Sequence, residues 1–331
     1  MRIPTGVTFE DGKLYYVDQT KLPGTFEKKE CTTLEEAEEA IRQLRVRGAP
    51  AIATFASFAA ALEMDRKRHL AHPQWKVEAE QVIDRLLATR PTAVNLSHAM
   101  KRLRERLAAG DRSLLSEAAA IQEEDKQLCD ALGKSGSTLI PAGARVITHC
   151  NTGALATAGI GTAIGSFYTA AAEGKDITVY ACETRPLLQG ARLTSWELDR
   201  AGIRTILITD SMAAFIMKTE KIDLVMVGAD RIAHNGDTAN KIGTLGLAVL
   251  AQHFGIPFYV VAPSTSVDPN LASGDLIHIE ERSAAEVRTI AGISTSPEHI
   301  AVRNPAFDVT PAELIRAIVT EKQIHFPPYS F

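Results

Sequence analysis

The second half of the chain alternates short apolar runs with longer stretches whose apolar residues recur at helical spacing. The run 224–227 is typical, because it is wholly apolar, bounded by polar residues and short enough for a strand buried on both faces. Such an alternation predicts βαβ units with right-handed crossovers, and therefore a parallel sheet. We expect strands at 146–148, 178–181, 205–208, 224–227 and 258–261, with helices near 155–172, 190–201, 211–220 and 241–254.

The first part of the chain has a different pattern, in which short strand-like runs precede long helical ones. Asp11-Gly12 is a hairpin signal between two such runs, and Thr32 or Thr33 can cap a helix that begins with glutamates. Near the other end, Thr310-Pro311-Ala312-Glu313 has the form of a capping box and predicts a last helix to about residue 320. Further helices are expected near 51–64, 75–88, 96–108 and 113–134.

Composition excludes several classes of protein. The 331 residues are 45% hydrophobic and 23% charged, which is ordinary, and a net charge of −4 gives no reason to expect a nucleic-acid partner. No apolar run approaches the roughly 20 residues needed to span a bilayer, and the first residues lack a basic-then-apolar signal pattern. Four scattered cysteines form no CxxC pair or Cys/His cluster, so no metal site is expected. We expect a cytoplasmic protein with reduced thiols and no membrane partner.

The strand–loop–helix unit over 222–244 carries the first candidate chemistry. Asp230 follows the strand that stops at Gly228, at a carboxyl end of the kind where open α/β sheets bind ligands. Asn240 and Lys241 open the next helical stretch, so Asn240 can cap a helix whose N-terminus, with Lys241 beside it, would hold a phosphate. This pattern favours an enzyme that acts on a small phosphorylated substrate. The alternative is an Asp230 in a structural ion pair and a solvated loop.

Two arginines and a cysteine could complete such a site. Arg47 precedes Gly48-Ala49-Pro50, a helix start with uncovered backbone N–H groups and hence a second possible anion site. Arg90 is held extended by the proline that follows it. Cys150 lies in a small polar loop after the first strand of the sheet, where N–H groups can stabilise a thiolate base or nucleophile. The structural alternatives are solvated arginines and a buried, inert thiol.

The loop after the second strand offers Arg185 and Gln189 as possible ligands of hydroxyl or phosphate groups. The glycines at 159, 161 and 165 resemble a dinucleotide fingerprint, with Glu183 where a ribose-binding acid would fall. A true fingerprint occupies the turn directly after a strand, whereas Gly159 lies well beyond Cys150. We therefore interpret these glycines as positions where a helix packs closely.

Six blocks of sequence resemble the methylthioribose-1-phosphate isomerase family of methionine salvage over essentially the whole chain. Their shared order is far more specific than any single block. The blocks are RGAPAIA (47–53), RPTAVNL (90–96), HCNTGALAT (149–157), ETRPLLQGARLT (183–194), GADRIAHNGDTANKIGT (228–244) and NPAFDVTPAELI (304–315).

The resemblance implies an aldose–ketose isomerisation of 5-methylthioribose 1-phosphate to 5-methylthioribulose 1-phosphate. It implies Asp230 as proton donor and Cys150 as the second catalytic group, in a homodimer without metal or nucleotide cofactor. It also implies an α/β fold, with a Rossmann-like parallel-sheet domain at 121–331 and a smaller domain of short antiparallel strands and a helical bundle at 1–120. The implied substrate contacts are Arg47, Gly48, Ala49, Arg90, Gln189, Asn240 and Lys241.

Elementary chemistry is consistent with this activity. A phosphate on C1 prevents the furanose from opening like a free sugar, so ring opening needs a proton at the ring oxygen, given by a carboxylic acid kept neutral. The apolar approach 224–229 would desolvate Asp230 and favour its neutral form. Hydrogen must then move between C2 and C1, and the sequence leaves open whether Cys150 takes a proton from C2 or polarises the substrate during a hydride shift.

Three alternative functions remain at this point. A related phosphosugar isomerase could act on ribose 1,5-bisphosphate, which needs a second cationic site, or on 5-deoxyribose 1-phosphate. Non-catalytic regulatory subunits of a translation-initiation exchange factor share the family's fold, although the intact blocks around Cys150 and Asp230 argue against that role. A nucleotide-dependent oxidoreductase would have to use the glycines at 159–165.

Overall fold

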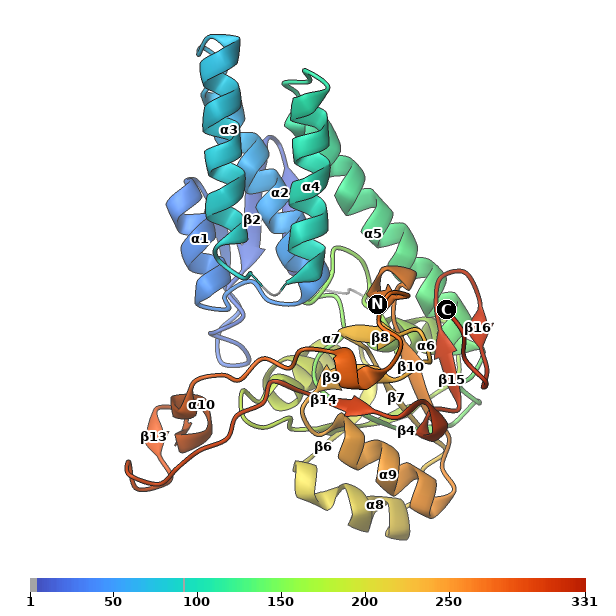
Figure 1. Ribbon diagram of the computed structural model, residues 1–331. Coiled ribbons are helices and arrows are strands. Elements are labelled where there is room, and N and C mark those ends of the chain that lie inside the picture. The colour runs from blue at the N-terminus through green and yellow to red at the C-terminus, as the bar shows by residue number, and fades with distance from the viewer. Residues whose placement is uncertain (1–4, 92) are drawn as a thin grey trace. The chain divides into compact units, whose positions relative to one another are not determined.

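The computed structural model describes residues 5–91 and 93–331, which separate into two units (Figure 1). The N-terminal unit extends to Asp130 and also includes Gly153–Gly161, and the second unit comprises Ala131–Thr152 and Thr162–Phe331. The change of unit therefore falls within the long helix α5 (Leu114–Ser137), and the boundary expected between residues 120 and 121 lies in the same helix.

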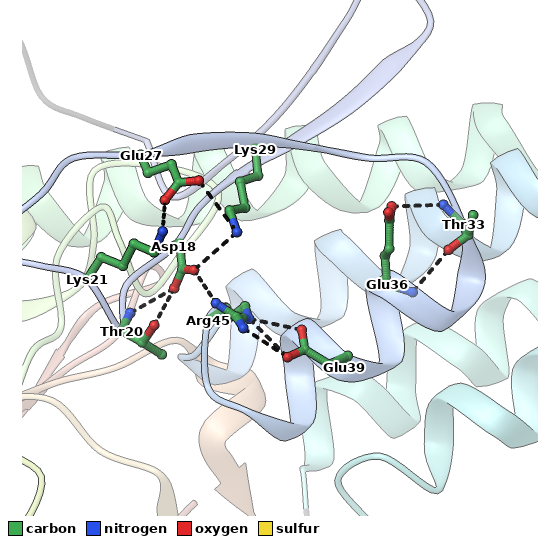
Figure 2. Close-up of polar contacts among 9 residues, drawn as sticks. All are labelled: Asp18, Thr20, Lys21, Glu27, Lys29, Thr33, Glu36, Glu39 and Arg45. Carbon is green, nitrogen blue, oxygen red and sulfur yellow. Dashed lines mark hydrogen bonds and ion pairs between the residues drawn. The ribbon is translucent and has the colours of Figure 1, made fainter. Parts of the chain in front are cut away.

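The N-terminal unit packs a small antiparallel sheet against helices. Its helix α2 is buried on all sides through its first three turns, as expected of a run that is apolar all round. Helix α1 begins with the predicted capping box, in which Thr33 accepts a hydrogen bond from Glu36 N–H and the Glu36 carboxylate accepts one from Thr33 N–H (Figure 2). The elements are β1 (Val7–Glu10), β2 (Lys13–Val17), β3 (Lys28–Cys31), α1 (Leu34–Arg42), α2 (Ala49–Arg66), α3 (His72–Leu87), α4 (Val94–Ala108) and the first part of α5.

The second unit is built on a seven-stranded, mostly parallel sheet, so the mixed α/β prediction is confirmed. The strands lie in the order β16-β15-β10-β7-β4-β5-β6, and only the edge strand β16 pairs antiparallel. Strands are added in one direction from β4 to β6 and in the other from β7 to β16, so the order reverses between β4 and β7. The strands are β4 (Arg145–Thr148), β5 (Thr178–Cys182), β6 (Arg204–Ile208), β7 (Leu224–Val227), β10 (Phe258–Val261), β15 (Ala317–Val319) and β16 (Ile324–His325).

Helices pack against the faces of this sheet. Helix α9 (Thr244–Phe254) packs on β7 and β10, and α8 (Ala213–Thr219) packs on α9, in a core that contains Val225, Val227 and Val260. Successive side chains of a strand point to opposite faces of the sheet. Helix α6 (Ala163–Ala172) also packs on β7. None of the helices within residues 5–91 and 93–331 combines the length and apolarity needed to cross a membrane.

A second, four-stranded sheet replaces elements that the sequence predicted otherwise. It has the order β11-β8-β9-β14 and lies within the same unit. The polar loop expected between β7 and the next helix is instead a hairpin, formed by β8 (Arg231–Ala233) and β9 (Thr238–Lys241), so helix α9 begins at Thr244 rather than near residue 241. The remaining members are β11 (Val267–Asp268) and β14 (Phe307–Thr310).

Two predicted helices are wrong or shortened. Residues 310–320 form a short 3-10 turn (Ala312–Leu314) and strand β15, because this β-branched segment pairs in parallel with β10 and so completes the sheet. Residues 153–161 form a loop of the N-terminal unit, closed by a bridge between Gly153 and Gly161, and α6 begins only at Ala163. In both places a contact distant in sequence overrides the local helical signal.

Candidate active site

The two predicted catalytic residues follow neighbouring strands at one edge of the sheet. Strands β4 and β7 are parallel neighbours in which Ile147 lies opposite Val225. Cys150 comes two residues after the end of β4, and Asp230 comes three residues after the end of β7. This edge holds the carboxyl ends of the strands at the point where the strand order reverses, which is where open α/β sheets bind ligands.

The loops beyond β4 and β7 also touch each other. The hydroxyl of Thr148, the last residue of β4, donates to the carbonyl of Met226 in β7 at 2.8 Å. A Cβ added to Gly228 would lie 2.6 Å from Cγ2 of Thr152, so only glycine fits between the two loops. The segments that carry Cys150 and Asp230 therefore leave the sheet side by side.

Cys150 is buried and has an unusual backbone conformation. Its relative exposure is 8% and its φ is 62°, in the left-handed region that non-glycine residues seldom occupy. Its N–H donates to Thr184 Oγ1 at 2.8 Å, and its carbonyl accepts from the hydroxyl of Thr194 at 2.6 Å. The backbone that carries the thiol is therefore held on both sides.

Asp230 has a different environment from the one that the sequence predicted. The apolar approach from Leu224 is fully buried along β7, yet Asp230 itself is exposed. The strand ends at Val227, so the carboxylate lies beyond the core, on a loop anchored by the bond from Asp230 N–H to Ala239 O (3.0 Å). Desolvation of this carboxylate is therefore not supplied by the strand that precedes it.

A buried polar cluster lies next to Cys150. His149 Nε2 is 2.8 Å from the carbonyl of Ile242, which assigns the proton to Nε2, and burial lowers the pKa of His149 and keeps the ring neutral. Burial raises the pKa of the Cys182 thiol and keeps it protonated. The Asp210 carboxylate accepts from the N–H groups of Thr184 and Arg185, both at 2.8 Å.

Ligand atoms of His149, Cys182 and Asp210 lie within 4.8 Å of one another, the one group among residues 5–91 and 93–331 that could hold a metal ion. The donor set does not fit that use well, because both Asp210 oxygens already accept backbone hydrogen bonds and the thiol is protonated. We interpret the cluster as a support for the loop after β5 (Cys182 to Gln189).

Gln189 has the features of a substrate ligand. The side chain is 6% exposed, and its Oε1 is buried without a hydrogen-bond donor among the described residues. Thr152 Oγ1, in the loop after β4, is unsatisfied in the same way. An unsatisfied buried oxygen costs about 1–3 kcal/mol, and two of them at the carboxyl edge of the sheet favour a ligand that carries hydroxyl or N–H donors.

Asn240 and Lys241 lie in strand β9, which corrects the predicted helix cap. Helix α9 has Gly243 as its N-cap, and the Asp308 carboxylate accepts from Gly243 N–H (2.7 Å) and Leu245 N–H (3.1 Å). An aspartate thus already occupies the anion site that the sequence assigned to this helix start. Lys241 Nζ donates to Ala306 O at 3.0 Å, and the buried Asn240 amide donates to Thr244 Oγ1 at 3.1 Å.

The N-terminal unit has a second helix start, at Gly48 and Ala49. Helix α2 begins at Ala49 with Gly48 as its N-cap at a φ of 90°, and Pro50, expected at the first helical position, lies in its first turn. Ala51 N–H donates to Ala156 O at 3.1 Å. In the part of the chain that the structure describes, the N–H groups of Gly48 and Ala49 have no acceptor, so they stay available to an anion.

Arg47 is oriented by residues that the sequence analysis missed. Its Nε donates to Gln19 Oε1 at 3.1 Å, and Gln19 Nε2 donates to Leu155 O at 2.8 Å. Gln19 is 1% exposed and follows Asp18, a fully buried carboxylate bonded to Thr20 and Arg45 (Figure 2). In the sequence, Asp18 and Gln19 are marked only as two polar residues directly after the apolar end of a strand.

The other two arginines differ in their surroundings. Arg90 lies half-buried in the connection between α3 and α4, where its N–H bonds to Leu87 O at 3.3 Å. The guanidinium of Arg185 donates to the carbonyls of Pro186 and Val287, at 2.9 and 2.8 Å. Arg185 therefore ties together loops of its own unit, which is a structural role.

The glycines that resemble a nucleotide fingerprint serve close packing. A Cβ on Gly159 would lie 2.7 Å from Cβ of Cys129 on α5, within the N-terminal unit. Strand β4 has ended at Thr148, so Gly159 is not in the turn that follows the strand. The geometry matches the packing interpretation.

Comparison with known proteins finds relatives over nearly the whole chain. The sequence matches the initiation factor 2 subunit family over residues 45–326. A methylthioribose-1-phosphate isomerase of Chloroflexus aurantiacus is 50% identical over 98% of this chain and 95% of its own length. A 5-deoxyribose 1-phosphate isomerase of Moorella thermoacetica is 47% identical over 98% of this chain and 94% of its own length.

The crystal structure of 5-methylthioribose 1-phosphate isomerase from Pyrococcus horikoshii has a TM-score of 0.93 and 39% identity, covering 99% of this chain and 94% of that one. The chain therefore belongs to the initiation factor 2 subunit family and, within it, groups with the methylthioribose-1-phosphate isomerases.

Proposed function

We propose that this protein is an aldose–ketose isomerase of methionine salvage, which converts 5-methylthioribose 1-phosphate into 5-methylthioribulose 1-phosphate. The names of its relatives support the reaction. The observation that carries the proposal is that Cys150 and Asp230 follow adjacent parallel strands at the point where the strand order reverses. That strand order also supports a Rossmann-like arrangement for the proposed catalytic domain at 121–331.

The proposed chemistry starts with opening of the furanose. The Asp230 carboxyl group gives its proton to the ring oxygen as the bond between C1 and that oxygen breaks. The hydrogen on C2 then moves to C1, the C2 hydroxyl returns a proton to the Asp230 carboxylate, and C2 becomes the carbonyl carbon of the ketose. Cys150 serves this second step, either as the base that takes a proton or by polarising C2 and its hydroxyl while hydride shifts. Because the product is an isomer of the substrate, the reaction has no net redox change and needs no nucleotide cofactor.

Exposure of Asp230 has a consequence for the order of events. A carboxylic acid donates a proton near neutral pH only when it is kept from water. Since Asp230 is exposed, we propose that the bound substrate itself covers the carboxyl group, so that protonation is coupled to binding. Proton uptake on binding, measured by calorimetry in buffers of different ionisation enthalpy, checks this step.

Substrate binding is proposed to use polar groups of the second unit. Gln189 Oε1 accepts a hydrogen bond from a sugar hydroxyl, because this oxygen is buried and otherwise unsatisfied. Lys241 provides a cation and Asn240 an amide. The implied roles of Arg47, Gly48, Ala49 and Arg90 as substrate contacts stay predictions, and the substrate affinity of single-substitution variants would test them.

The test is NMR of 5-methylthioribose 1-phosphate incubated with the protein in deuterated water. We expect conversion to the ketose, and the deuterium content at C1 separates proton transfer from hydride transfer. Asp230→Asn should abolish turnover while substrate still binds, and Cys150→Ala should lower kcat at least about 100-fold. Matched controls are Asp199→Asn, an exposed aspartate on α7 (Ser195–Arg200), and Cys31→Ala, a buried thiol of the N-terminal unit. Near-normal turnover by both site variants would refute the catalytic assignment.

Substrate choice within the family is a separate question. The relative from Moorella thermoacetica is named for 5-deoxyribose 1-phosphate, which lacks the methylthio group. Comparison of kcat/KM for the methylthio sugar, the deoxy sugar and ribose 1,5-bisphosphate decides among the three. Absence of turnover with all three would favour a non-catalytic subunit, as the family name allows.

A homodimer is proposed for the assembly. Residues 277–304 form an arm with α10 (Ala284–Arg288) and a hairpin of β12 (Thr289–Ile290) and β13 (Ile293–Ser294), which extends away from the sheet of its own unit (Figure 1). Ile293 and Ile300 on this arm are 70% and 48% exposed, an arrangement that favours burial against a second copy. Light scattering should give a dimer, and Ile293→Glu should weaken it more than Val77→Glu, an exposed site on α3.

The proposed location is the cytoplasm. All four cysteines are buried and none forms a disulfide, as expected in a reducing compartment. Fractionation of the source cell would test the assignment.

A further inference from the structure

Cys150 and Thr184 share a strained backbone conformation. Their φ values are 62° and 66°, and neither is a glycine. Left-handed φ is especially unfavourable for a β-branched residue such as threonine. Such conformations persist only where surrounding interactions hold them, so the contacts of these two residues identify what orients the thiol.

Two threonine hydroxyl groups hold the Cys150 backbone from both sides. Thr184 Oγ1 accepts from Cys150 N–H at 2.8 Å, and the Thr184 hydroxyl donates to Cys182 O at 3.1 Å. The Thr194 hydroxyl donates to Cys150 O at 2.6 Å. Both threonines are fully buried, so water cannot substitute for either hydroxyl.

Each threonine is itself held by a polar neighbour. The Asp210 carboxylate accepts from Thr184 N–H, which fixes the strained turn. Asn151 Nδ2 donates to Thr194 Oγ1 at 3.2 Å and to Glu197 Oε1 at 3.1 Å. Thr194 ends a π-helical turn, Gly190–Thr194, a rare conformation that is frequent at functional sites.

Gly190 allows these two threonine-bearing segments to approach. A Cβ at this position would lie 2.9 Å from Thr184 Oγ1 and would overlap the carbonyl of Cys182. The segment from Thr184 to Thr194 is therefore folded back on itself, and its two ends meet at Cys150.

We infer that Thr184 and Thr194 are positioning residues for the reaction, which fix the direction of the Cys150 thiol by clamping its N–H and carbonyl groups. The inference rests on the catalytic role proposed for Cys150. It assigns the loop after β5 two tasks, since Gln189 of the same loop is a proposed substrate ligand. Substrate binding at Gln189 and thiol direction at Cys150 then depend on one segment of chain.

Valine and serine variants test the inference, because valine keeps the shape of threonine and serine keeps its hydroxyl. We expect Thr184→Val and Thr194→Val each to lower kcat about 10- to 100-fold with KM changed less than about threefold, the size of effect that misplacement by about 1 Å produces. Thr184→Ser and Thr194→Ser should keep kcat within about threefold of the parent. Thr169→Val, which removes a hydroxyl bonded to Gly165 O on α6, is the control.

The rate at which iodoacetamide alkylates Cys150, followed by mass spectrometry, gives a readout that does not depend on turnover. We expect both valine variants to change this rate at least about threefold, and the serine variants and Thr169→Val to leave it unchanged. An unchanged alkylation rate in the valine variants overturns the inference, as does equal loss of kcat in valine and serine variants. A different result is full turnover by Cys150→Ala together with a changed alkylation rate of Cys150 in the threonine-to-valine variants. In that case the catalytic role of Cys150 fails, and the two threonines hold the Cys150 backbone for a structural reason only.

Discussion

Asp125 on helix α5 offers a test of electrostatics within the N-terminal unit. Its carboxylate accepts a hydrogen bond from Ala158 N–H at 2.6 Å, and burial raises its pKa from 3.8 to about 6. The folded protein therefore binds this proton more tightly than the unfolded chain does. Stability contributed by this group is present below pH 3.8 and is lost as the pH rises through about 6.

Replacement by asparagine removes the ionisation and keeps an amide oxygen for Ala158. A pKa rise from 3.8 to about 6 corresponds to about 3 kcal/mol, since each unit is worth about 1.36 kcal/mol. Because the side chain retains some contact with water, we expect Asp125→Asn to gain about 1 to 3 kcal/mol at about pH 8. The gain should shrink to less than about 1 kcal/mol at about pH 4, where the carboxyl group is protonated in the folded state and about two-fifths protonated in the unfolded state.

Urea unfolding measured at both pH values checks this prediction. Trp75 is buried in the same unit, so its fluorescence reports the unfolding of the structure that surrounds Asp125. Asp130→Asn, on the exposed face of the same helix, is the control and should show no such pH-dependent gain. The reasoning is refuted if Asp125→Asn is no more stable than the parent at the higher pH, or if its gain is equal at both.

Two further predictions concern the residues around Arg47. Gln19→Leu removes the acceptor of the Arg47 Nε–H bond. We expect the KM for the phosphosugar to rise about 10-fold with kcat little changed, as for loss of one hydrogen bond to a charged group. An unchanged KM would show that Gln19 has only a structural role. Gly48→Ala should cost more than about 2 kcal/mol of stability in urea unfolding, because φ is 90° and the new Cβ would lie 2.5 Å from Cα of Ala156. Gly110→Ala has a similar φ of 79° but open space around the new Cβ, so a cost near about 1 kcal/mol is expected there, and equal costs at both sites would contradict the packing argument.

Five of the seven strands of the main sheet could be predicted almost to the residue. Strands β7 and β10 have the bounds that their apolar runs indicated, because strands buried on both faces must be apolar throughout. The capping box at Thr33 was also readable, since caps depend on residues close in sequence. Local chemistry decides these features.

Other elements were misread because local signals competed. Asn235-Gly236 between two short runs is a hairpin signal, and β8 and β9 do flank it, but Asn240 also has the chemistry of a helix cap. The capping box at Thr310 predicted a helix, but the segment that follows pairs as strand β15 with β10. The anion site expected at the start of α9 is occupied by the carboxylate of Asp308, which accepts a hydrogen bond from Gly243 N–H. Asp308 lies 65 positions away from Gly243 in the sequence.

The sequence by itself determined which residues stand at the ends of buried strands, and so named Cys150 and Asp230 as chemical groups at a sheet edge. Only the tertiary structure decided that β4 and β7 are neighbours, which puts those two residues on adjacent loops. It also brought Thr184 and Thr194 to Cys150 from 34 and 44 positions away. The physical reason is that periodicity and capping record interactions within a few residues, whereas strand order and hydrogen bonds between loops depend on how the whole chain packs.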